Sequence, residues 1–176
     1  MPHPLDIFHF CPLCGSKNFG VNNLKSKECA DCGFIYYANP SAAVAAVIEN
    51  EKDEILVARR AKEPAKGTFD LPGGFSDMDE TIEESVRREV KEETSLDVTE
   101  LSFLFSIPNI YVYSGMEIHT MDLFFRCKVK NFNGLTAKDD VAELVFIPVK
   151  QLNPKDFGLT SIRKGIEKLQ KILINV

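Results

Sequence analysis

A glycine-rich turn followed by a short, glutamate-rich helix is the feature that most constrains this chain. Gly73 and Gly74 form the turn, and Glu89, Glu92 and Glu93 lie on the predicted helix. Residues three and four apart share one face of a helix, so these glutamates are expected to project together. Carboxylates roughly 6 Å apart repel by about 3 kcal/mol per pair at an effective dielectric constant of about 20. The pattern therefore predicts a hard divalent cation, Mg²⁺ or Mn²⁺, which would hold substrate phosphates and generate a nucleophilic water.

Local signals define this helix and its orientation. Thr81 followed by Glu84 is typical of a capping box, which starts a helix. Arg88 comes one turn after Glu84 and one turn before Glu92, so it can brace either glutamate by an ion pair. The apolar residues at helical spacing, which are expected to dock the helix on a core, are Ile82, Val86 and Val90.

The same segment resembles the Nudix box, the signature of the Nudix hydrolases. The box reads Gly, five residues, Glu, seven residues, Arg-Glu, an aliphatic residue, any residue, Glu-Glu, any residue, Gly and an aliphatic residue. The matching positions are Gly74, Glu80, Arg88, Glu89, Val90, Glu92, Glu93 and Leu96. A charge run alone usually marks a solvated helix face, but here the full pattern is present and favours a metal site.

Ser95 is the one departure from the box, which has glycine at this position. The residue just past a helix end often adopts the left-handed conformation, which costs a residue with a side chain on the order of 1 kcal/mol. We therefore expect a slightly strained helix end and lower stability, with activity retained because no ligand is lost.

The resemblance implies an α/β fold of the Nudix type, an α/β/α sandwich with a mixed sheet, and divalent-metal-dependent hydrolysis of a pyrophosphate bond. It implies that Glu89 and Glu93 are the main metal ligands, and that Glu92 joins them or helps to activate water. Glu80 with Arg88 would support the site. Gly74 would let the backbone approach the metal and phosphate closely.

Family members also recruit an acid from a later loop, and the general base stays open at this point. Glu143, or Asp139 and Asp140, are the candidates for that acid.

The rest of the chain is read as strands and one closing helix. Strands are expected at 42–48, 55–59, 101–106, 110–113, 119–129 and 144–147, on the basis of their apolar and β-branched composition. Apolar residues at helical spacing between Ser161 and Asn175 predict an amphipathic helix. Together these elements predict a mixed sheet between helices.

Four of the five cysteines form two C-x₂-C pairs near the N-terminus: Cys11 with Cys14, and Cys29 with Cys32. This spacing is typical of a zinc ribbon, in which four thiolates close a tetrahedral structural Zn²⁺ site. Two disulfides are the alternative, which the missing export signal disfavours. We expect a ribbon at residues 1–38 and the hydrolase domain at 39–176. A module of this size needs the metal to fold.

Charge and hydropathy set limits on partners and location. The net charge of −5 offers no general attraction to nucleic acid or to an anionic membrane. No apolar run approaches the length of a membrane-spanning helix, and the N-terminus lacks a signal-peptide pattern, so a cytoplasmic location is expected. The sequence leaves the oligomeric state open, and a homodimer is one possibility.

A zinc ribbon ahead of a Nudix domain resembles the NADH pyrophosphatase branch, whose members carry a Ser-Gln-Pro-Trp-type segment after the box. Here Ile107 replaces Gln and Asn109 replaces Trp. Asn109 could hydrogen-bond a base and Tyr111 and Tyr113 could stack on one, or they are ordinary strand residues. Arg59, with its basic neighbours Arg60 and Lys62, could steer phosphates. The expected substrate is a nucleoside diphosphate linked to another group, with NADH, NAD, ADP-ribose and a noncanonical nucleotide open.

The alternative function is a non-catalytic protein that uses the ribbon to bind RNA or a protein partner. The ribbon has only Lys17, Lys25 and Lys27 as basic residues, too few for a convincing nucleic-acid footprint. An inert domain would also have no need for three mutually repelling glutamates. A small nucleotide substrate is therefore the expected partner.

Overall fold

The computed structural model describes residues 3–174, apart from the side chain of the last of these. Its strands and helices follow each other in the order β1 Phe19–Asn23, β2 Ser26–Cys29, β3 Ile35–Tyr37, β4 Ser41–Ile48, β5 Glu54–Arg60, β6 Phe69–Asp70, α1 Ile82–Thr94, β7 Val98–Tyr113, β8 Met116–Val129, β9 Val141–Pro148 and α2 Thr160–Ile174. Two short 3₁₀ turns, Val149–Gln151 and Pro154–Asp156, connect β9 to α2.

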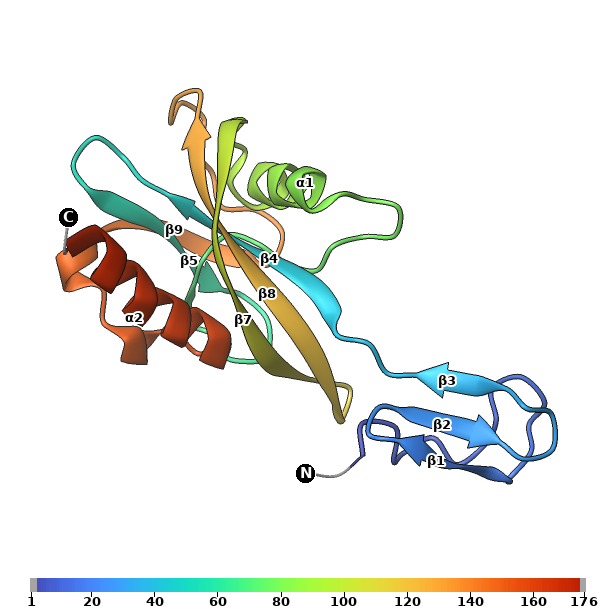
Figure 1. The fold of residues 1–176 in the computed structure, drawn as a ribbon. Helices are drawn as coiled ribbons and strands as arrows, with labels where there is room; N and C mark the ends of the chain where they lie inside the picture. The colour runs from blue at the N-terminus through green and yellow to red at the C-terminus, as the bar shows by residue number, and fades with distance from the viewer. Residues whose placement is uncertain (1–2, 175–176) are drawn as a thin grey trace.

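Two three-stranded sheets make up the middle layer of the larger part of the molecule (Figure 1). β8 is the centre of the first sheet; it pairs in parallel with β4 and antiparallel with β7. β5 is the centre of the second; it pairs antiparallel with β6 and β9. Helices α1 and α2 lie on opposite sides of this layer. The predicted α/β/α sandwich with a mixed sheet is confirmed.

Strand β4 shows why both helices can dock. Its apolar run is buried on both faces, as expected of a strand that lies between two layers. Val44, Ala46 and Ile48 pack in one core with Val86 and Val90 of α1. The alternate residues of β4 point the other way and pack in the second core beneath α2. The members of that core on these two elements are Ala45, Val47, Ile162, Ile166 and Leu169.

Helix α1 forms where its local signals predict. The Thr81 side chain accepts from the Glu84 N–H, and the Glu84 side chain accepts from the Thr81 N–H, so the predicted capping box is present. The helix ends at Ser95 in the left-handed conformation, with φ 66°. The expected left-handed conformation at Ser95 is therefore present, and among the described residues the buried Ser95 hydroxyl has no hydrogen-bond partner.

One difference from the sequence prediction lies in β7. Two strands were expected around Pro108, but 98–113 is one continuous strand with a register irregularity between Phe103 and Phe105. β7 is an edge strand of its sheet, where a proline removes no ladder hydrogen bond that a neighbour needs. The closing helix spans Thr160–Ile174, and the predicted last residue, Asn175, lies outside the described part of the chain.

The N-terminal strands β1, β2 and β3 form a separate antiparallel sheet. It lies beyond the hairpin end of β7 and β8 (Figure 1). Its small core contains Cys11, Phe19 and Cys29. Among the helices described, none is long and apolar enough to cross a membrane.

Candidate active site

Arg88 is the centre of the acidic cluster on α1. It binds both carboxylate oxygens of Glu80, with Nε 2.8 Å and Nη2 2.9 Å from them. Its Nη1 donates to Glu89 at 2.9 Å and to Glu92 at 3.1 Å, and Nη2 also donates to the Phe75 carbonyl at 3.0 Å. Of the two braces expected for Arg88, the one to Glu92 is present, while Glu84 serves the helix cap. This network fixes the turn against the helix.

Glu89 and Glu93 face the glycine turn. The Gly73 N–H donates to Glu93 Oε2 over 2.9 Å. A Cβ on Gly74 would lie 2.6 Å from Glu89 Oε1, so only glycine leaves room for that carboxylate. Glu93 is 8% exposed, whereas the side chain of Glu92 is 50% exposed. Two of the three expected carboxylates therefore approach the turn, and the third lies at the solvent edge.

The electrostatics of the two inner carboxylates favour a cation. Burial is the main cause that raises the pKa of Glu93 to about 9; Asp70, Glu89 and Asp139 add to the rise, and the Gly73 N–H opposes it. Burial also raises the pKa of Glu89, against the attraction of Arg88. By contrast, the hydrogen bonds from Arg88 lower the pKa of Glu80 to about 2. Glu80 is thus held ionised by Arg88, whereas at Glu89, which Arg88 also binds, and at Glu93 burial outweighs the favourable contacts.

This donor set fits a hard cation in chemistry, because carboxylate oxygens are the ligands that Mg²⁺ and Mn²⁺ prefer. The carboxylates do not yet converge in the way that the four N-terminal cysteines do. Within residues 3–174, those cysteines are the one group of three or more Cys, His, Asp or Glu side chains whose ligand atoms gather closely enough to hold an ion.

The three candidate acids from the later part of the chain have different partners. Asp139 raises the pKa of both Glu89 and Glu93, so its charge is near both. Asp140 pairs with Lys62. Glu143, on β9, forms an ion pair with Arg59 at 2.9 Å. Of the three candidates from sequence, Asp139 is the one whose charge acts on both Glu89 and Glu93.

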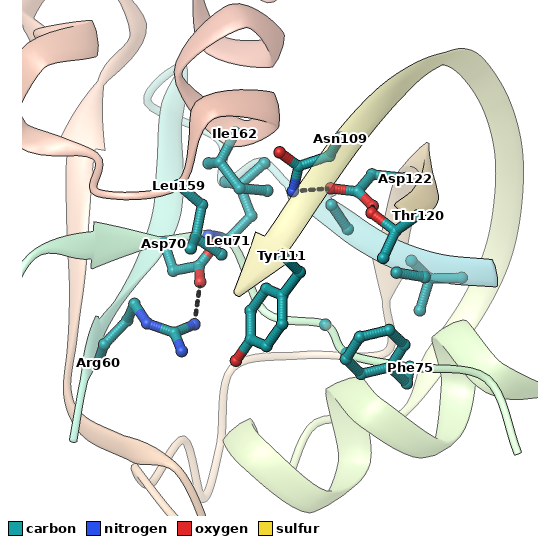
Figure 2. A pocket seen from close by; sticks show the side chains of 15 residues that line it. Arg60, Asp70, Leu71, Phe75, Asn109, Tyr111, Thr120, Asp122, Leu159 and Ile162 are labelled. Atoms are coloured by element: carbon teal, nitrogen blue, oxygen red, sulfur yellow. Dashed lines mark hydrogen bonds and ion pairs between the residues drawn. The ribbon is translucent and has the colours of Figure 1, made fainter. Parts of the chain in front are cut away.

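A pocket borders the glycine turn; Figure 2 shows the side chains that line it. Gly73 and Gly74 contribute to its wall. Its polar and aromatic side chains come from five segments, and its apolar floor comes from β4, the turn and the start of α2. The residues with side-chain roles in the pocket are Arg60, Asp70, Phe75, Asn109, Tyr111, Thr120, Asp122, Leu159 and Ile162.

Strand alternation explains why polar groups gather here. Phe105 and Ile107 of β7 lie in the core beneath α2, and Asn109 and Tyr111 follow at the same period of two. The face that is apolar beneath α2 therefore becomes polar where the helix begins. Tyr113 continues the same face but is 61% exposed and lies outside the pocket.

The two arginines of β5 point in different directions. Arg59 donates to Glu143 and to the Gly67 carbonyl, and its guanidinium lies 4.3 Å from the centre of the Phe69 ring. Arg60 lines the pocket and binds Asp70 Oδ2 at 2.6 Å. Burial lowers the pKa of Arg60, but Asp70 and Tyr111 raise it by more, so the guanidinium stays charged.

Sequence reasoning missed four pocket residues: Asp70, Phe75, Thr120 and Asp122. Asp122 carried a usable signal, because it stands two residues before Phe124, on the same face of the strand, and the apolar run 123–125 follows it directly. An ionisable residue on the inward face of a strand is seldom buried without a purpose. The others carried no local signal.

The four N-terminal cysteines form a compact cluster. The Sγ atoms of Cys11 and Cys32 are 3.7 Å apart, those of Cys14 and Cys29 are 3.6 Å apart, and all four gather within 4.8 Å of one another. These distances exceed the length of a disulfide, about 2.05 Å, and all four are free thiols. They match the edge of about 3.8 Å expected for a tetrahedron with Zn–S bonds of about 2.3 Å. The cluster therefore fits a Zn²⁺ ion.

Comparisons with known proteins agree with this geometry. The chain is 37% identical over 130 residues to the ADP-ribose pyrophosphatase of Methanocaldococcus jannaschii, and the alignment covers 73% of each protein. It is 30% identical over 142 residues to the NAD-capped RNA hydrolase NudC of Vibrio atlanticus, which covers 81% of this chain and 49% of that protein. The chain spans about half the length of the first curated relatives that it matches.

Among solved structures, a NUDIX hydrolase from Nitrosomonas europaea matches with a TM-score of 0.73 and 21% identity, over 96% of this chain and 93% of that one. At this identity the likeness shows the fold alone. A family model of the NUDIX domain matches residues 39–169. With that match over most of its length and a relative at 37% identity, the chain belongs to the Nudix hydrolase family.

Proposed function

We propose that the chain hydrolyses the diphosphate bond of a nucleoside diphosphate linked to another group, using a divalent cation. One observation carries the proposal: two carboxylates of α1 approach the Gly73–Gly74 turn, and the same turn forms part of the wall of a pocket with aromatic and polar side chains. A diphosphate that crosses this turn would have its bridge near the carboxylates and its nucleoside in the pocket.

The roles follow from position and exposure. Glu89 and Glu93 are the proposed metal ligands, because they are the least exposed of the three helix glutamates and both approach the glycine turn. Glu92 is the proposed third member, either as ligand or in activating water, since its exposed side chain can swing inward from Arg88. The cation, Mg²⁺ or Mn²⁺, would neutralise charge on the phosphates and supply an activated water. Arg88 and Glu80 hold the turn in position against the helix.

We assign the later acid to Asp139 in preference to Glu143. The charge of Asp139 acts on Glu89 and Glu93, whereas Glu143 is engaged by Arg59. Asp139→Asn should lower kcat by more than tenfold, in keeping with general-base or metal-positioning roles. Glu143→Gln should cost less. Equal losses of kcat in the two variants would show that Glu143 also acts in the site.

Four residues are proposed substrate contacts, and the structure supports them to different degrees. Asn109 and Tyr111 line the pocket. Arg60, in place of Arg59, is the proposed residue that steers phosphates, since it points into the pocket with a charged guanidinium. Tyr113 would reach substrate only from the exposed end of the β7–β8 hairpin.

The relatives support the substrate class. One carries the name ADP-ribose pyrophosphatase and another the name NAD-capped RNA hydrolase, and both names describe a diphosphate joined to a nucleoside. ADP-ribose, NAD and NADH are the proposed candidates. Water adds across the P–O–P bridge, so ADP-ribose would yield AMP and ribose 5-phosphate.

An activity screen tests the proposal. The full chain is incubated with ADP-ribose, NAD, NADH, nucleotide sugars, dNTPs and an RNA oligonucleotide with a 5′-NAD cap, each with Mg²⁺ or Mn²⁺, and the products are separated by chromatography. Release of a nucleoside monophosphate from at least one dinucleotide or nucleotide sugar is expected. No cleavage of any substrate, with tight and salt-sensitive RNA binding, would favour the non-catalytic alternative.

The cysteine cluster supports a second, structural metal. We propose that residues 1–38 form a zinc ribbon and that residues 39–176 form the hydrolase domain. The four thiolates would occupy all positions of a tetrahedral Zn²⁺ and leave none for catalysis. A homodimer stays a proposal that size measurements in solution would test.

A further inference from the structure

Asp122 is a buried carboxylate that the proposed hydrolysis does not use. It lies on β8 and is 7% exposed. Thr120 Oγ1 donates to its Oδ1 at 2.5 Å, and Asn109 Nδ2 donates to its Oδ2 at 3.3 Å. The hydroxyl of Ser161, at the start of α2, also donates to Oδ2. Three neutral donors, from two strands and a helix, therefore surround one carboxylate.

This arrangement fixes the direction of the Asn109 amide. An ionised carboxylate only accepts hydrogen bonds, so the amide must turn its NH₂ group toward Asp122. Its Oδ1 then lies on the side away from Asp122 (Figure 2). No protein donor reaches this oxygen in the part of the chain that the structure describes. The pocket is thus lined by an amide whose oxygen has a fixed orientation and accepts from no described residue.

The surroundings of this acceptor suit a flat aromatic ligand. The rings of Phe75 and Tyr111 meet edge to face, with centroids 5.5 Å apart, and Phe75 is 40% exposed. Leu159 and Ile162 add apolar surface. Aromatic and apolar walls with one oriented polar group are the usual composition of a site for a flat aromatic ligand.

The charge of the pocket favours an amino group over a carbonyl. Asp122 is balanced by neutral donors, so its negative potential extends to the acceptor beside it. An exocyclic amino group would bring a donor to Asn109 Oδ1, whereas a carbonyl would bring a second acceptor next to a carboxylate. A carbonyl would leave two acceptors facing each other without a donor between them.

We propose that Asp122 is a positioning residue, an inference that rests on the proposed function. It holds the Asn109 amide oxygen as a fixed acceptor for the exocyclic amino group of a purine base, so the site prefers nucleotides of an amino-bearing purine. Asn109 touches the base, and Asp122 acts through it.

The test uses binding without turnover, so that it does not depend on hydrolysis. Isothermal titration of the full chain measures AMP, inosine monophosphate and purine riboside 5′-monophosphate, which lacks any group at position 6. The wild type should bind AMP about tenfold more tightly than either analogue, since 1.4 kcal/mol is a factor of ten. Equal affinity for the three, including no measurable binding of any, overturns the proposal.

Two variants separate contact from positioning. Asn109→Leu should reduce the AMP preference to about one. Asp122→Asn is close in size and keeps hydrogen-bonding capacity, but its amide no longer dictates the orientation of Asn109, so the preference should fall below about threefold. Thermal melting checks that both variants fold. A full preference in folded Asp122→Asn overturns the positioning role, even if Asn109→Leu behaves as expected.

Failure of this proposal is distinct from failure of the proposed function. If wild type selects AMP but cleaves no diphosphate, the binding pocket stands and the hydrolysis does not. If it cleaves ADP-ribose and its 6-deamino analogue with equal kcat/KM, hydrolysis stands and the base preference does not.

Discussion

The backbone N–H of Gly73 donates to Glu93 Oε2 over 2.9 Å, and this bond joins the turn directly to the helix that follows it. Gly73 has φ 152°, and a Cβ at this position would lie 2.0 Å from the Val44 carbonyl oxygen. The neighbouring Gly74 carbonyl accepts from the Val44 N–H at 2.8 Å. The turn is therefore held against β4 on one side and against a buried carboxylate on the other.

Gly73→Ala should destabilise the fold strongly, because the clash is with backbone that cannot move aside. A loss of more than about 2 kcal/mol in the free energy of unfolding is expected, measured by urea denaturation. Gly20→Ala is the control, since a Cβ there meets no atom within 4 Å. It should change stability by less than about 1 kcal/mol. A Gly73→Ala protein as stable as wild type would contradict the geometry of the turn.

Ser95→Gly should stabilise the protein by about 1 kcal/mol without changing kcat, because glycine adopts the left-handed conformation freely. Ser95→Ala is the matched control. It keeps the left-handed backbone and removes only the buried hydroxyl, which has no hydrogen-bond partner within residues 3–174. Thermal unfolding of the three proteins should rank glycine as the most stable. Equal gains from glycine and alanine would assign the effect to the hydroxyl.

The stability of the metal-free protein should fall as the pH rises from about 4.5 to 9. The pKa of Glu93 is raised to about 9 in the folded state, mainly by burial, above the ordinary glutamate value of 4.5. A raised pKa contributes stability that is complete below the unfolded value and is lost as the pH passes through the folded value. Urea unfolding without added Mg²⁺ or Mn²⁺ measures this slope.

Glu93→Gln removes the ionisation and should flatten this part of the pH profile. Glu83→Gln is the control, because it makes the same chemical change on an exposed position of the same helix. A profile in Glu93→Gln that matches the wild type would show that the slope has another origin.

Removal of zinc should loosen the N-terminal sheet. A chelator is expected to release one Zn²⁺ per chain and to expose residues 1–38 to proteolysis, because a module of this size depends on its metal. Cys14→Ser should have the same effect without chelator. Cys127→Ser should not, since Cys127 lies buried in the core beside α1 and outside the cluster. An unchanged proteolysis pattern in Cys14→Ser would require a different stabilising element.

Local signals predicted the parts of this fold that local physics controls. The capping box, the apolar stripe and the left-handed Ser95 depend on residues near one another in sequence, and all three are present. The four-cysteine cluster followed from spacing in the same way.

Contacts between strands that are distant in the chain could not be predicted from the sequence. Arg59 and Arg60 are neighbours, and only the pairing of β5 with β6 and β9 decides which one enters the pocket. The same pairing places Glu143 opposite Arg59 and commits it to an ion pair. Asp122 acquires its partners only when β7, β8 and the start of α2 meet. The register of the paired strands therefore decides which side chains line the pocket, and residue type alone could not predict them.

The account depends most directly on Glu89 and Glu93 binding a divalent cation that supports hydrolysis. Mn²⁺ titrations followed by electron paramagnetic resonance, with ADP-ribose or the best substrate from the screen assayed in the same samples, test this claim. Wild type and Glu83→Gln should bind Mn²⁺ and turn over. Glu93→Gln should bind it at least tenfold more weakly and hydrolyse about a hundredfold more slowly or worse. A folded Glu93→Gln protein with wild-type Mn²⁺ affinity and turnover would contradict the account.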